Sequence, residues 1–270
     1  MLSRLPAHAV IALWTLLIGV PLYLLTVSTF KSTLEIYQNP LGLPEAFTLD
    51  NFVEAWVRAD FSTYSWNSLV VTVGSILLTL LLALLASYPI SRFRSWWATP
   101  MLGFFLLGLL VPVRLASVEL FMLMKDLGLL NSHLGLILVY TATRLPFAIF
   151  ILSNFMRAVP VELEEAARLD GAGHVRLLWS VLTPQVRPAV GIVTIFTAIA
   201  VWNDFYFPLL FIFDPKMRTL PLGLSTFVGQ YGTDWGVLFA GLLLSMLPLA
   251  LLFLFTSKQV REGVGAGGVK

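Results

Sequence analysis

Long apolar runs dominate this chain and leave few ways for it to fold. Six runs of about 20 residues or more carry very few charges, and that length lets an α-helix cross the hydrocarbon core of a bilayer. Inside hydrocarbon every backbone N–H and C=O needs a partner within the protein, which a continuous apolar run provides as a helix. We therefore predict an all-α integral membrane protein, a single domain over residues 1–270. Its six transmembrane helices are expected at about 8–30, 66–90, 100–124, 134–157, 186–210 and 236–256.

Composition supports this class and excludes others. Hydrophobic residues make up 58% of the chain and charged residues 12%, with a mean hydropathy of +0.86, far from the soluble average. The basic residues are spread over the loops, so no nucleic-acid partner is expected. The chain has no cysteine, and its three histidines, His8, His133 and His174, lie far apart. We expect no metal site and no cofactor on this chain.

Sequence signatures of enzymes are also missing. No G-x-x-x-x-G-K-[ST] phosphate loop occurs, so the chain is not expected to hydrolyse nucleotide. No H-E-x-x-H or G-x-S-x-G pattern occurs, which leaves an intramembrane enzyme without a nucleophile and a base. We predict that the chain is not an enzyme and that any energy-requiring step depends on a partner.

Lys and Arg in the short loops predict the orientation. Ten of these basic residues fall on one side of the predicted spans and five on the other, and the richer side faces the cytoplasm. Arg4 precedes the first apolar run, but the run is too long for the core of a cleaved signal, so we expect it to be retained. Both termini are predicted to be cytoplasmic.

The segment 158–185 differs from its surroundings because it is charged and contains two glycines between apolar runs. Pro160 suits the first turn of a helix, and the glutamates at 162, 164 and 165 complement the positive end of the helix dipole. Gly171 supplies the backbone freedom that ends a helix. We predict a short helix, a sharp turn and a second helix that re-enters the membrane. On composition alone, an ordinary solvated loop remains the alternative.

The order of residues in this segment resembles a known signature. Glu165-Ala166-Ala167, Gly171 and Val181-Leu182-Thr183-Pro184 are similar to the loop of bacterial ATP-binding-cassette importer permeases, which reads Glu-Ala-Ala, Gly, Ile-x-Leu-Pro. Val181 and Thr183 depart from it at the hydrophobic end. The resemblance implies a cytoplasmic coupling helix between spans 4 and 5 that docks on an ATPase. The residues it assigns to this coupling are Glu164, Glu165, Ala166, Ala167, Asp170 and Gly171.

Other segments resemble the carbohydrate-type members of that family. They are Phe47-Thr48-Leu49, Asn67-Ser68-Leu69, Leu145-Pro146-Phe147, Trp202-Asn203-Asp204 and the tail from Glu262 to Lys270, in which Val264, Gly265 and Gly268 depart from the usual pattern. The resemblance implies a permease that imports a sugar or a glycerol-phosphate-like solute by alternating access in the bacterial cytoplasmic membrane. Its implied partners are a second permease subunit in a hetero-oligomer, two ATP-binding subunits that hold ATP and Mg, and an extracytoplasmic solute-binding protein.

Polar residues within the predicted spans are candidates for the translocation pathway. A charge at the bilayer centre costs about 2.5–3.5 kcal/mol on insertion scales, so it usually faces a cavity or a partner. We select Asn154, Trp202, Asn203 and Asp204, of which Asp204 is the best case. Asp204 could line the pathway, or it could lock the bundle by pairing with a basic residue on a neighbouring helix. The sequence does not decide between these two roles.

An ion-coupled secondary transporter is the alternative function. It would need its own ion-coupling site, for which Asp204, Glu119 and Arg144 are the only obvious material. It would also transport without an ATPase, so co-purification with an ATPase would separate the two functions.

The predicted orientation can be checked with reporter fusions. Because of the bias in Lys and Arg, fusions after Glu45 and Lys216 should report the outer side, and fusions after Ser95, Gly173 and Lys258 the cytoplasm. A cytoplasmic signal at position 45 would reverse the whole orientation.

Overall fold

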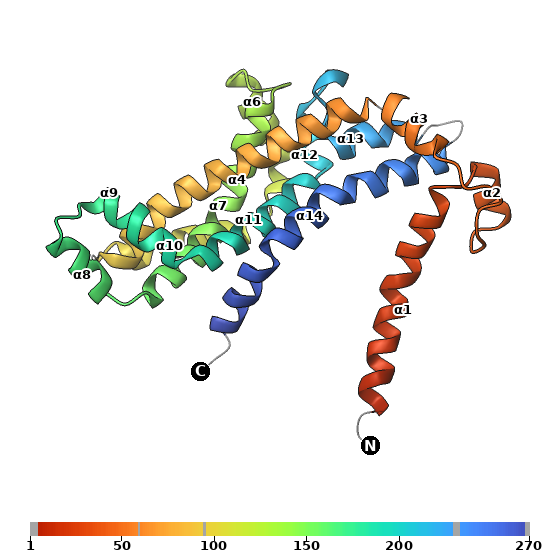
Figure 1. Ribbon diagram of the computed structural model, residues 1–270. Coiled ribbons are helices and arrows are strands. Elements are labelled where there is room, and N and C mark those ends of the chain that lie inside the picture. Colours follow the sequence, from red (N-terminus) through yellow and green to blue (C-terminus); the bar gives the residue numbers. More distant parts are fainter. Residues whose placement is uncertain (1–4, 59, 94–95, 229–232, 268–270) are drawn as a thin grey trace. The chain divides into compact units, whose positions relative to one another are not determined.

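The computed structural model describes residues 5–58, 60–93, 96–228 and 233–267. The described residues are nearly all helical, and their one β feature is an isolated bridge between Val228 and Thr233 (Figure 1). The prediction of an all-α protein is confirmed. Arg4, Arg94 and Lys270, which entered the charge count, and Ser95, chosen for a fusion, lie outside the described residues, as does the end of the tail.

The chain packs as two compact units, of which the first comprises Met1–Ser65 and Leu220–Pro248. Lys31 is fully buried there, and its ammonium group donates to the carbonyl oxygen of Asn39 at 2.7 Å, which fixes the loop after the first helix. Ala55 packs against Val237 and Ala240 in a small apolar core. The helices of this unit are α1 Leu5–Ser28, α2 Thr33–Gln38, α3 Asp50–Arg58, α13 Leu220–Leu224, η5 Ser225–Phe227 and the first part of α14 Trp235–Gly267.

The second unit comprises Trp66–Thr219 and Leu249–Lys270 and is centred on α7 His133–Ala158. α7 packs against α5, α11 and α12, and its inner face shares an apolar core with α4 and with the segment that follows residue 176. Leu84, Leu152, Leu182 and Val193 meet in this core. The remaining elements are α4 Phe61–Arg92, α5 Ala98–Leu110, η2 Val113–Ala116, α6 Ser117–Asp126, α8 Glu162–Leu169, α9 His174–Arg176, η3 Leu177–Leu182, α10 Thr183–Gln185, α11 Arg187–Trp202, α12 Tyr206–Phe211 and η4 Pro215–Met217.

Among the residues that the structure describes, four helices are long and apolar enough to cross a membrane. They are α1, α4, α7 and α14, and they coincide with the spans predicted at 8–30, 66–90, 134–157 and 236–256. Two further pairs of helices reach the required length only if each bent pair is counted as one span. The six-span count and the single domain over residues 1–270 therefore stay predictions.

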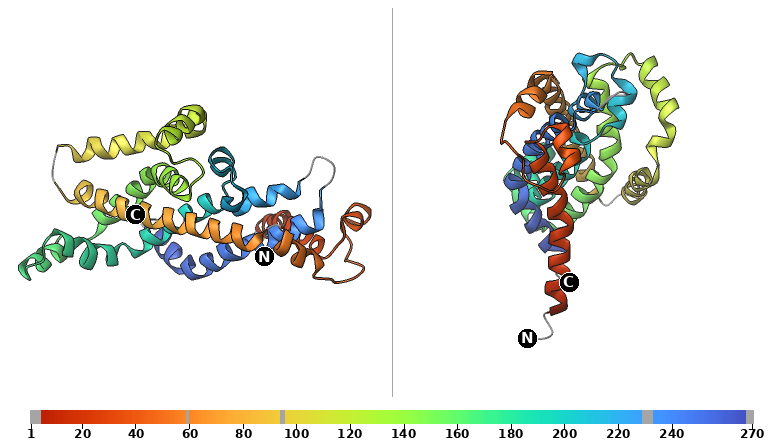
Figure 2. Two further views of the ribbon diagram at one scale, coloured as in Figure 1. Left: turned by 90° about the horizontal axis from the view of Figure 1, so that it is seen from above. Right: turned by 90° about the vertical axis from the view of Figure 1, so that its right-hand side faces the viewer.

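The span predicted at 100–124 is not one straight helix. α5 ends at Leu110, and the chain continues through η2 into α6 after a bend of 73° (Figure 2, left, in yellow to yellow-green). The cause is Pro112, because a residue that precedes proline is pushed out of the helical region. Val111 accordingly has φ −75° and ψ 117°, an extended conformation that interrupts the helix.

The span predicted at 186–210 is also wrong in its bounds. α11 begins at Arg187 after a bend of 79°, and it ends at Trp202, eight residues earlier than predicted. Pro188 lacks the N–H that would continue the preceding helix, so a new helix begins there. At the other end, the chain leaves the helix at Asn203 and Asp204 and starts the short helix α12 at Tyr206. Trp202 is thus the last residue of α11, and Asn203 and Asp204 follow the helix instead of lying within it.

Candidate functional site

The segment between α7 and α11 forms the helix that its sequence predicts. α8 Glu162–Leu169 carries Glu162, Glu164 and Glu165 in its first turn and Arg168 in its last, as the helix dipole favours. In Figure 1, α8 and α9 lie at the end of the second unit, next to the last turns of α4. The chain then returns through α9, the π-helix η3 and α10 to α11.

Gly171 ends α8 through a specific backbone geometry. Its φ is +80°, in the left-handed region, and a Cβ added there would meet nothing within 4 Å. Its N–H donates to the carbonyl oxygen of Arg168 at 3.0 Å, and the N–H of Ala172 donates to that of Ala167 at 2.9 Å. These two bonds make a Schellman turn, which satisfies the last carbonyls of the helix. Gly171 is needed for the sign of its φ and not for lack of space.

The six residues predicted for coupling do not share one environment. Glu164 is buried, whereas Glu165, Ala166, Asp170 and Gly171 are exposed and Ala167 is half-buried. Glu164 turns inward and pairs with Arg92 at the end of α4, and both side chains are more than nine-tenths buried. The four exposed residues form a polar surface that faces solvent and from which Ala166 and Gly171 protrude little. Only this outward part of the predicted set is available to another protein.

An exposed apolar residue, which sequence reasoning missed, belongs to the same surface. Leu169, in the last turn of α8, is 90% exposed, and Val161 and Val175 on either side of the helix are exposed as well. Large apolar side chains gathered on a polar surface mark a site of protein contact. Once the buried face of α8 is known, Leu169 can be identified on its exposed face.

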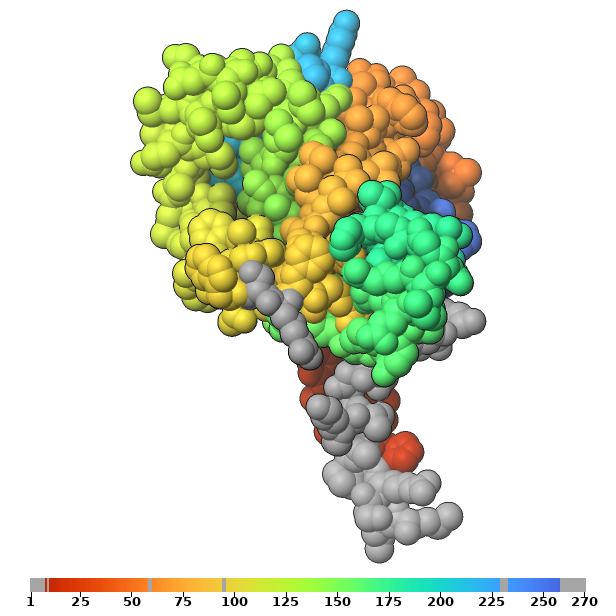
Figure 3. Space-filling model, turned by 90° about the vertical axis from the view of Figure 1, so that its left-hand side faces the viewer, coloured from red at the N-terminus to blue at the C-terminus, as the bar shows by residue number. Residues whose placement is uncertain are grey.

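Contacts from α4 hold this segment in place, and sequence reasoning missed them too. The Nη2 of Arg92 donates to the carbonyl oxygen of Val159 at 2.9 Å. The hydroxyl of Tyr88 lies 2.8 Å from Nδ1 of His174, and the ring of Phe93 packs on the same histidine. Figure 3 shows the segment, in green, against the surface of α4. These contacts join residues that are 67 to 86 positions apart, so no local pattern indicates them.

Asp204 is the centre of a second cluster of polar residues. Its side chain is 9% exposed, and its Oδ2 accepts hydrogen bonds from the Tyr140 hydroxyl at 2.9 Å and from the Phe207 N–H at 3.0 Å. Its Oδ1 pairs with Nη2 of Arg114 at 3.2 Å. Three donors from α7, α12 and η2 therefore meet on one carboxylate. This geometry favours the locking role for Asp204, and its pathway role stays a prediction.

Arg114 extends the lock to the bend between α5 and α6. Its guanidinium lies 5.1 Å from the centre of the Tyr206 ring, a cation–π contact, and the hydroxyls of Ser117 and Tyr206 share a hydrogen bond. Arg144 lies one turn after Tyr140 on α7 and lines the same cavity of about 350 Å³. Two guanidinium groups and one carboxylate thus face a small polar cavity.

The four residues predicted for the pathway do not form one site. Trp202 is buried, and the exposed side chain of Asn203 only bonds back to the carbonyl oxygen of Ile199. Asn154 likewise bonds back to its own helix. It lies fourteen residues after Tyr140, the α7 partner of Asp204, so a rise of about 1.5 Å per residue places it about 21 Å away along the axis.

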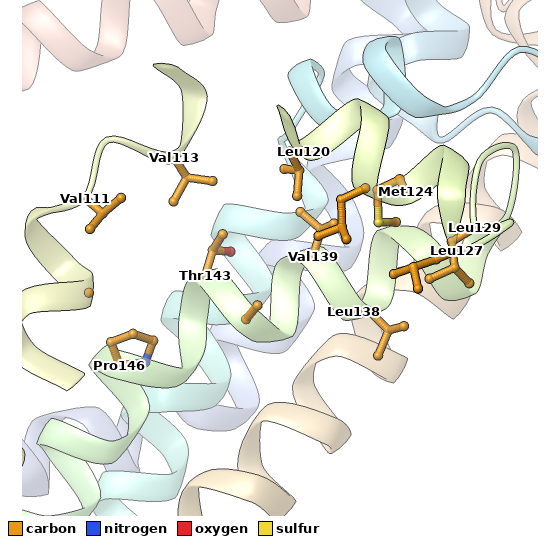
Figure 4. A pocket seen from close by; sticks show the side chains of 13 residues that line it. Val111, Val113, Leu120, Met124, Leu127, Leu129, Leu138, Val139, Thr143 and Pro146 are labelled. Carbon is orange, nitrogen blue, oxygen red and sulfur yellow. The ribbon is translucent and has the colours of Figure 1, made fainter. Parts of the chain in front are cut away.

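A second cavity of different character lies beside α7. It has a volume of about 430 Å³ and is lined mainly by apolar side chains from the bend, from α6 and from α7, among them Val113, Leu120, Met124, Val139 and Pro146 (Figure 4). Thr143 is the only polar residue in its lining. In the part of the chain that the structure describes, no group of three His, Asp or Glu residues could hold a metal ion.

Comparison with known proteins identifies relatives. A family described as "binding-protein-dependent transport system inner membrane component" matches residues 75–261. The diacetylchitobiose uptake system permease protein NgcG of Streptomyces coelicolor is 35% identical over 263 residues, which cover 97% of this chain and 87% of that protein. The melibiose/raffinose/stachyose import permease protein MelC of Bacillus subtilis is 30% identical over 252 residues, which cover 93% of this chain and 91% of that protein.

A solved structure shows the same fold. A chain of a bacterial ABC transporter involved in the import of the acidic polysaccharide alginate superposes with a TM-score of 0.85 at 19% identity, covering 95% of this chain and 96% of that one.

The locking geometry of Asp204 predicts a loss of stability on substitution. Asp204→Ala leaves the buried Tyr140 hydroxyl without its acceptor, which costs about 1–3 kcal/mol before the loss of the Arg114 pair is counted. We expect a lower yield and a lower melting temperature of the purified protein. Asn203→Ala, one residue away, removes only a bond within α11 and is the matched control.

Thiol labelling separates the two roles of Asp204. A cysteine at position 204 should stay unreactive towards a water-soluble reagent, since the site is nearly closed, while a cysteine at the exposed position 203 should react. Normal stability of Asp204→Ala together with a reactive cysteine at 204 would reject the lock in favour of the pathway.

Proposed function

This chain belongs to the family of binding-protein-dependent transport system inner membrane components, and from that premise we propose that it is the permease subunit of an ATP-driven importer. It is a multi-pass membrane protein that moves its solute across the bacterial cytoplasmic membrane by alternating access. It hydrolyses no ATP itself. Two ATP-binding subunits do so with Mg, a second permease subunit completes the pathway, and an extracytoplasmic solute-binding protein delivers the solute. Both termini and α8 lie on the cytoplasmic side.

The observation that carries this proposal is the exposed face of α8. A short helix stands between two apolar segments, ends in a Schellman turn at Gly171 and displays Leu169 to solvent. A large apolar side chain that stands exposed among polar residues marks a surface for contact with another protein. We assign this face the docking on the ATPase, with Glu165 and Asp170 as its charged rim.

The geometry of α8 accounts for how motion would be transmitted. ATP binding closes the two ATPases, and α8 moves with the pocket that holds it. Because α8 connects to α7 through only a short link and to α11 through η3 and α10, both helices receive the displacement. Packed helices behave as discrete rigid bodies and rotate as units. The spans thereby rock from the inward-facing to the outward-facing state.

The solute is proposed to be a sugar or a short oligosaccharide. The relatives that cover most of this chain are named for the uptake of diacetylchitobiose and of melibiose, raffinose and stachyose. The polar cavity with Arg114, Arg144 and Asp204 offers guanidinium donors of the kind that bind hydroxyl or acidic groups.

An ion-coupled secondary transporter has less support. Glu119 is exposed, and both oxygens of Asp204 already accept hydrogen bonds from Arg114, Tyr140 and the backbone of α12. A carboxylate occupied by three donors offers little to a coupling cation.

Gly171 tests the docking helix, and Gly173 supplies the matched control. Valine at 171 must adopt a positive φ, which costs about 1–2 kcal/mol, whereas Gly173 has φ −75° and ψ 173°, a conformation that valine accepts. Neither position has an atom within 4 Å of an added Cβ. In the complex reconstituted with its partners, Gly171→Val should lose solute-stimulated ATP hydrolysis while Gly173→Val keeps it. Equal stimulation in both variants would show that the turn has no part in coupling.

A panel of solutes tests the substrate class. In proteoliposomes that contain the complete complex and its binding protein, ATP hydrolysis should rise with a neutral oligosaccharide such as diacetylchitobiose or melibiose. Methionine serves as the amino-acid control and should give no stimulation. Stimulation by the amino acid alone would contradict the sugar class while leaving the importer function intact.

A further inference from the structure

Two contacts join the end of α4 to the coupling segment, by which we mean residues 158–185. One contact lies at the start of α8 and the other lies after its end. At the start of α8, Glu164 pairs with Arg92. After the turn that ends α8, His174 meets the Tyr88 hydroxyl at 2.8 Å and the ring of Phe93. Tyr88, Arg92 and Phe93 all belong to the last turns of α4 or follow it directly.

The ion pair is of the buried kind. The side chain of Arg92 is 8% exposed and that of Glu164 is 6% exposed. Each charge has lost most of its hydration, and the attraction of the opposite charge offsets that loss. Arg92 also donates to the carbonyl oxygen of Val159, the residue that caps α7. One guanidinium therefore joins the ends of α4 and α7 to the first turn of α8.

α4 differs from α7 and α11 in how it is connected to the coupling segment. α7 and α11 continue into the segment along the chain, but α4 is more than 60 residues away from it in sequence. The apolar core that α4 shares with α7 and η3 holds the helices together without fixing direction, because hydrophobic contact is non-directional. A hydrogen bond does fix direction, and Nη2 of Arg92 donates one to the carbonyl oxygen of Val159 while the Tyr88 hydroxyl shares one with His174. Together with the ion pair between Arg92 and Glu164, these contacts hold the end of α4 against the residues on both sides of α8.

We infer that α4 is a third element driven by the coupling helix, and that Arg92 and Glu164 are the positioning residues that make it follow α8. This inference rests on the proposed function, since it needs an ATPase that moves α8. When α8 moves, the pair displaces α4 at the same time as the covalent connections of the chain displace α7 and α11. Without the pair, α8 moves while α4 lags, and ATP is hydrolysed without opening the pathway.

The first experiment is a double-mutant cycle in the reconstituted complex. Arg92→Gln and Glu164→Gln keep most of the side-chain volume and remove the charge. Each should raise the ATP hydrolysed per solute transported several-fold, and the double variant should be no worse than the poorer single variant, because the two residues act through one contact. Glu162→Gln, an exposed position in the same first turn, should leave the ratio at the wild-type value. Single variants that keep the wild-type ratio would overturn the inference.

A second experiment distinguishes positioning from simple structural support. The chain has no cysteine, so Arg92→Cys with Glu164→Cys places two unique thiols across the contact. A cavity of about 410 Å³ beside the pair, lined by Ser91, Phe93, Val161, Glu165 and Arg168 as well, leaves room for a short bifunctional thiol reagent. The reagent is a bis-methanethiosulfonate, which forms a disulfide with each cysteine and releases two methanesulfinate ions. It should restore the ATP-to-solute ratio of this variant, and reduction of the two disulfides by an added thiol should abolish the gain.

The outcomes separate this inference from the function on which it rests. If wild-type hydrolysis does not respond to solute, the proposed function fails. If the wild type responds and the bridged variant stays uncoupled, the transmission through α4 is rejected. If the charge variants do not assemble, Tyr88→Phe and His174→Ala test the second tie by the same ratio, and wild-type coupling in both would likewise reject it.

Discussion

The need to satisfy every backbone hydrogen bond away from water governs this structure. In hydrocarbon an unpaired N–H or C=O costs several kcal/mol, so apolar stretches become continuous helices, and every interruption needs a substitute partner. Two helix ends show what such a substitute requires. After the end of α11, the N–H of Phe207 in the first turn of α12 donates to the carboxylate of Asp204. At the end of α8 the Schellman turn at Gly171 bonds the last carbonyls.

The sequence predicted those parts of the fold that local patterns determine. The unbroken apolar runs placed α1, α4, α7 and α14, and the glutamates followed by Gly171 placed α8 and its end. The apolar runs did not place the bends, because hydropathy averages over a window and does not register backbone conformation. The prolines are the local signal for them, since Pro112 and Pro188 each exclude a continuous helix at a definite residue.

The candidate site was predicted in its location but not in its contacts. The sequence assigned both Glu164 and Glu165 to coupling, yet one is buried against Arg92 and the other is exposed, because successive residues of an α-helix are rotated by about 100°. Tyr140 and Arg114, which hold Asp204, are 64 and 90 residues away from it. Contacts at such separations follow from the packing of α7 against α5, α11 and α12, which no single-sequence pattern contains.

The exposure of Leu169 bears on how the cell would handle this protein. A bare leucine at the tip of a helix resembles the apolar signals by which chaperones and proteases recognise incomplete proteins, and burial in a partner removes the signal. On the proposed function, a copy synthesised without a partner ATPase would keep that leucine exposed, and an assembled copy would bury it. The lifetime of the membrane subunit would then depend on the supply of the subunit that it docks on.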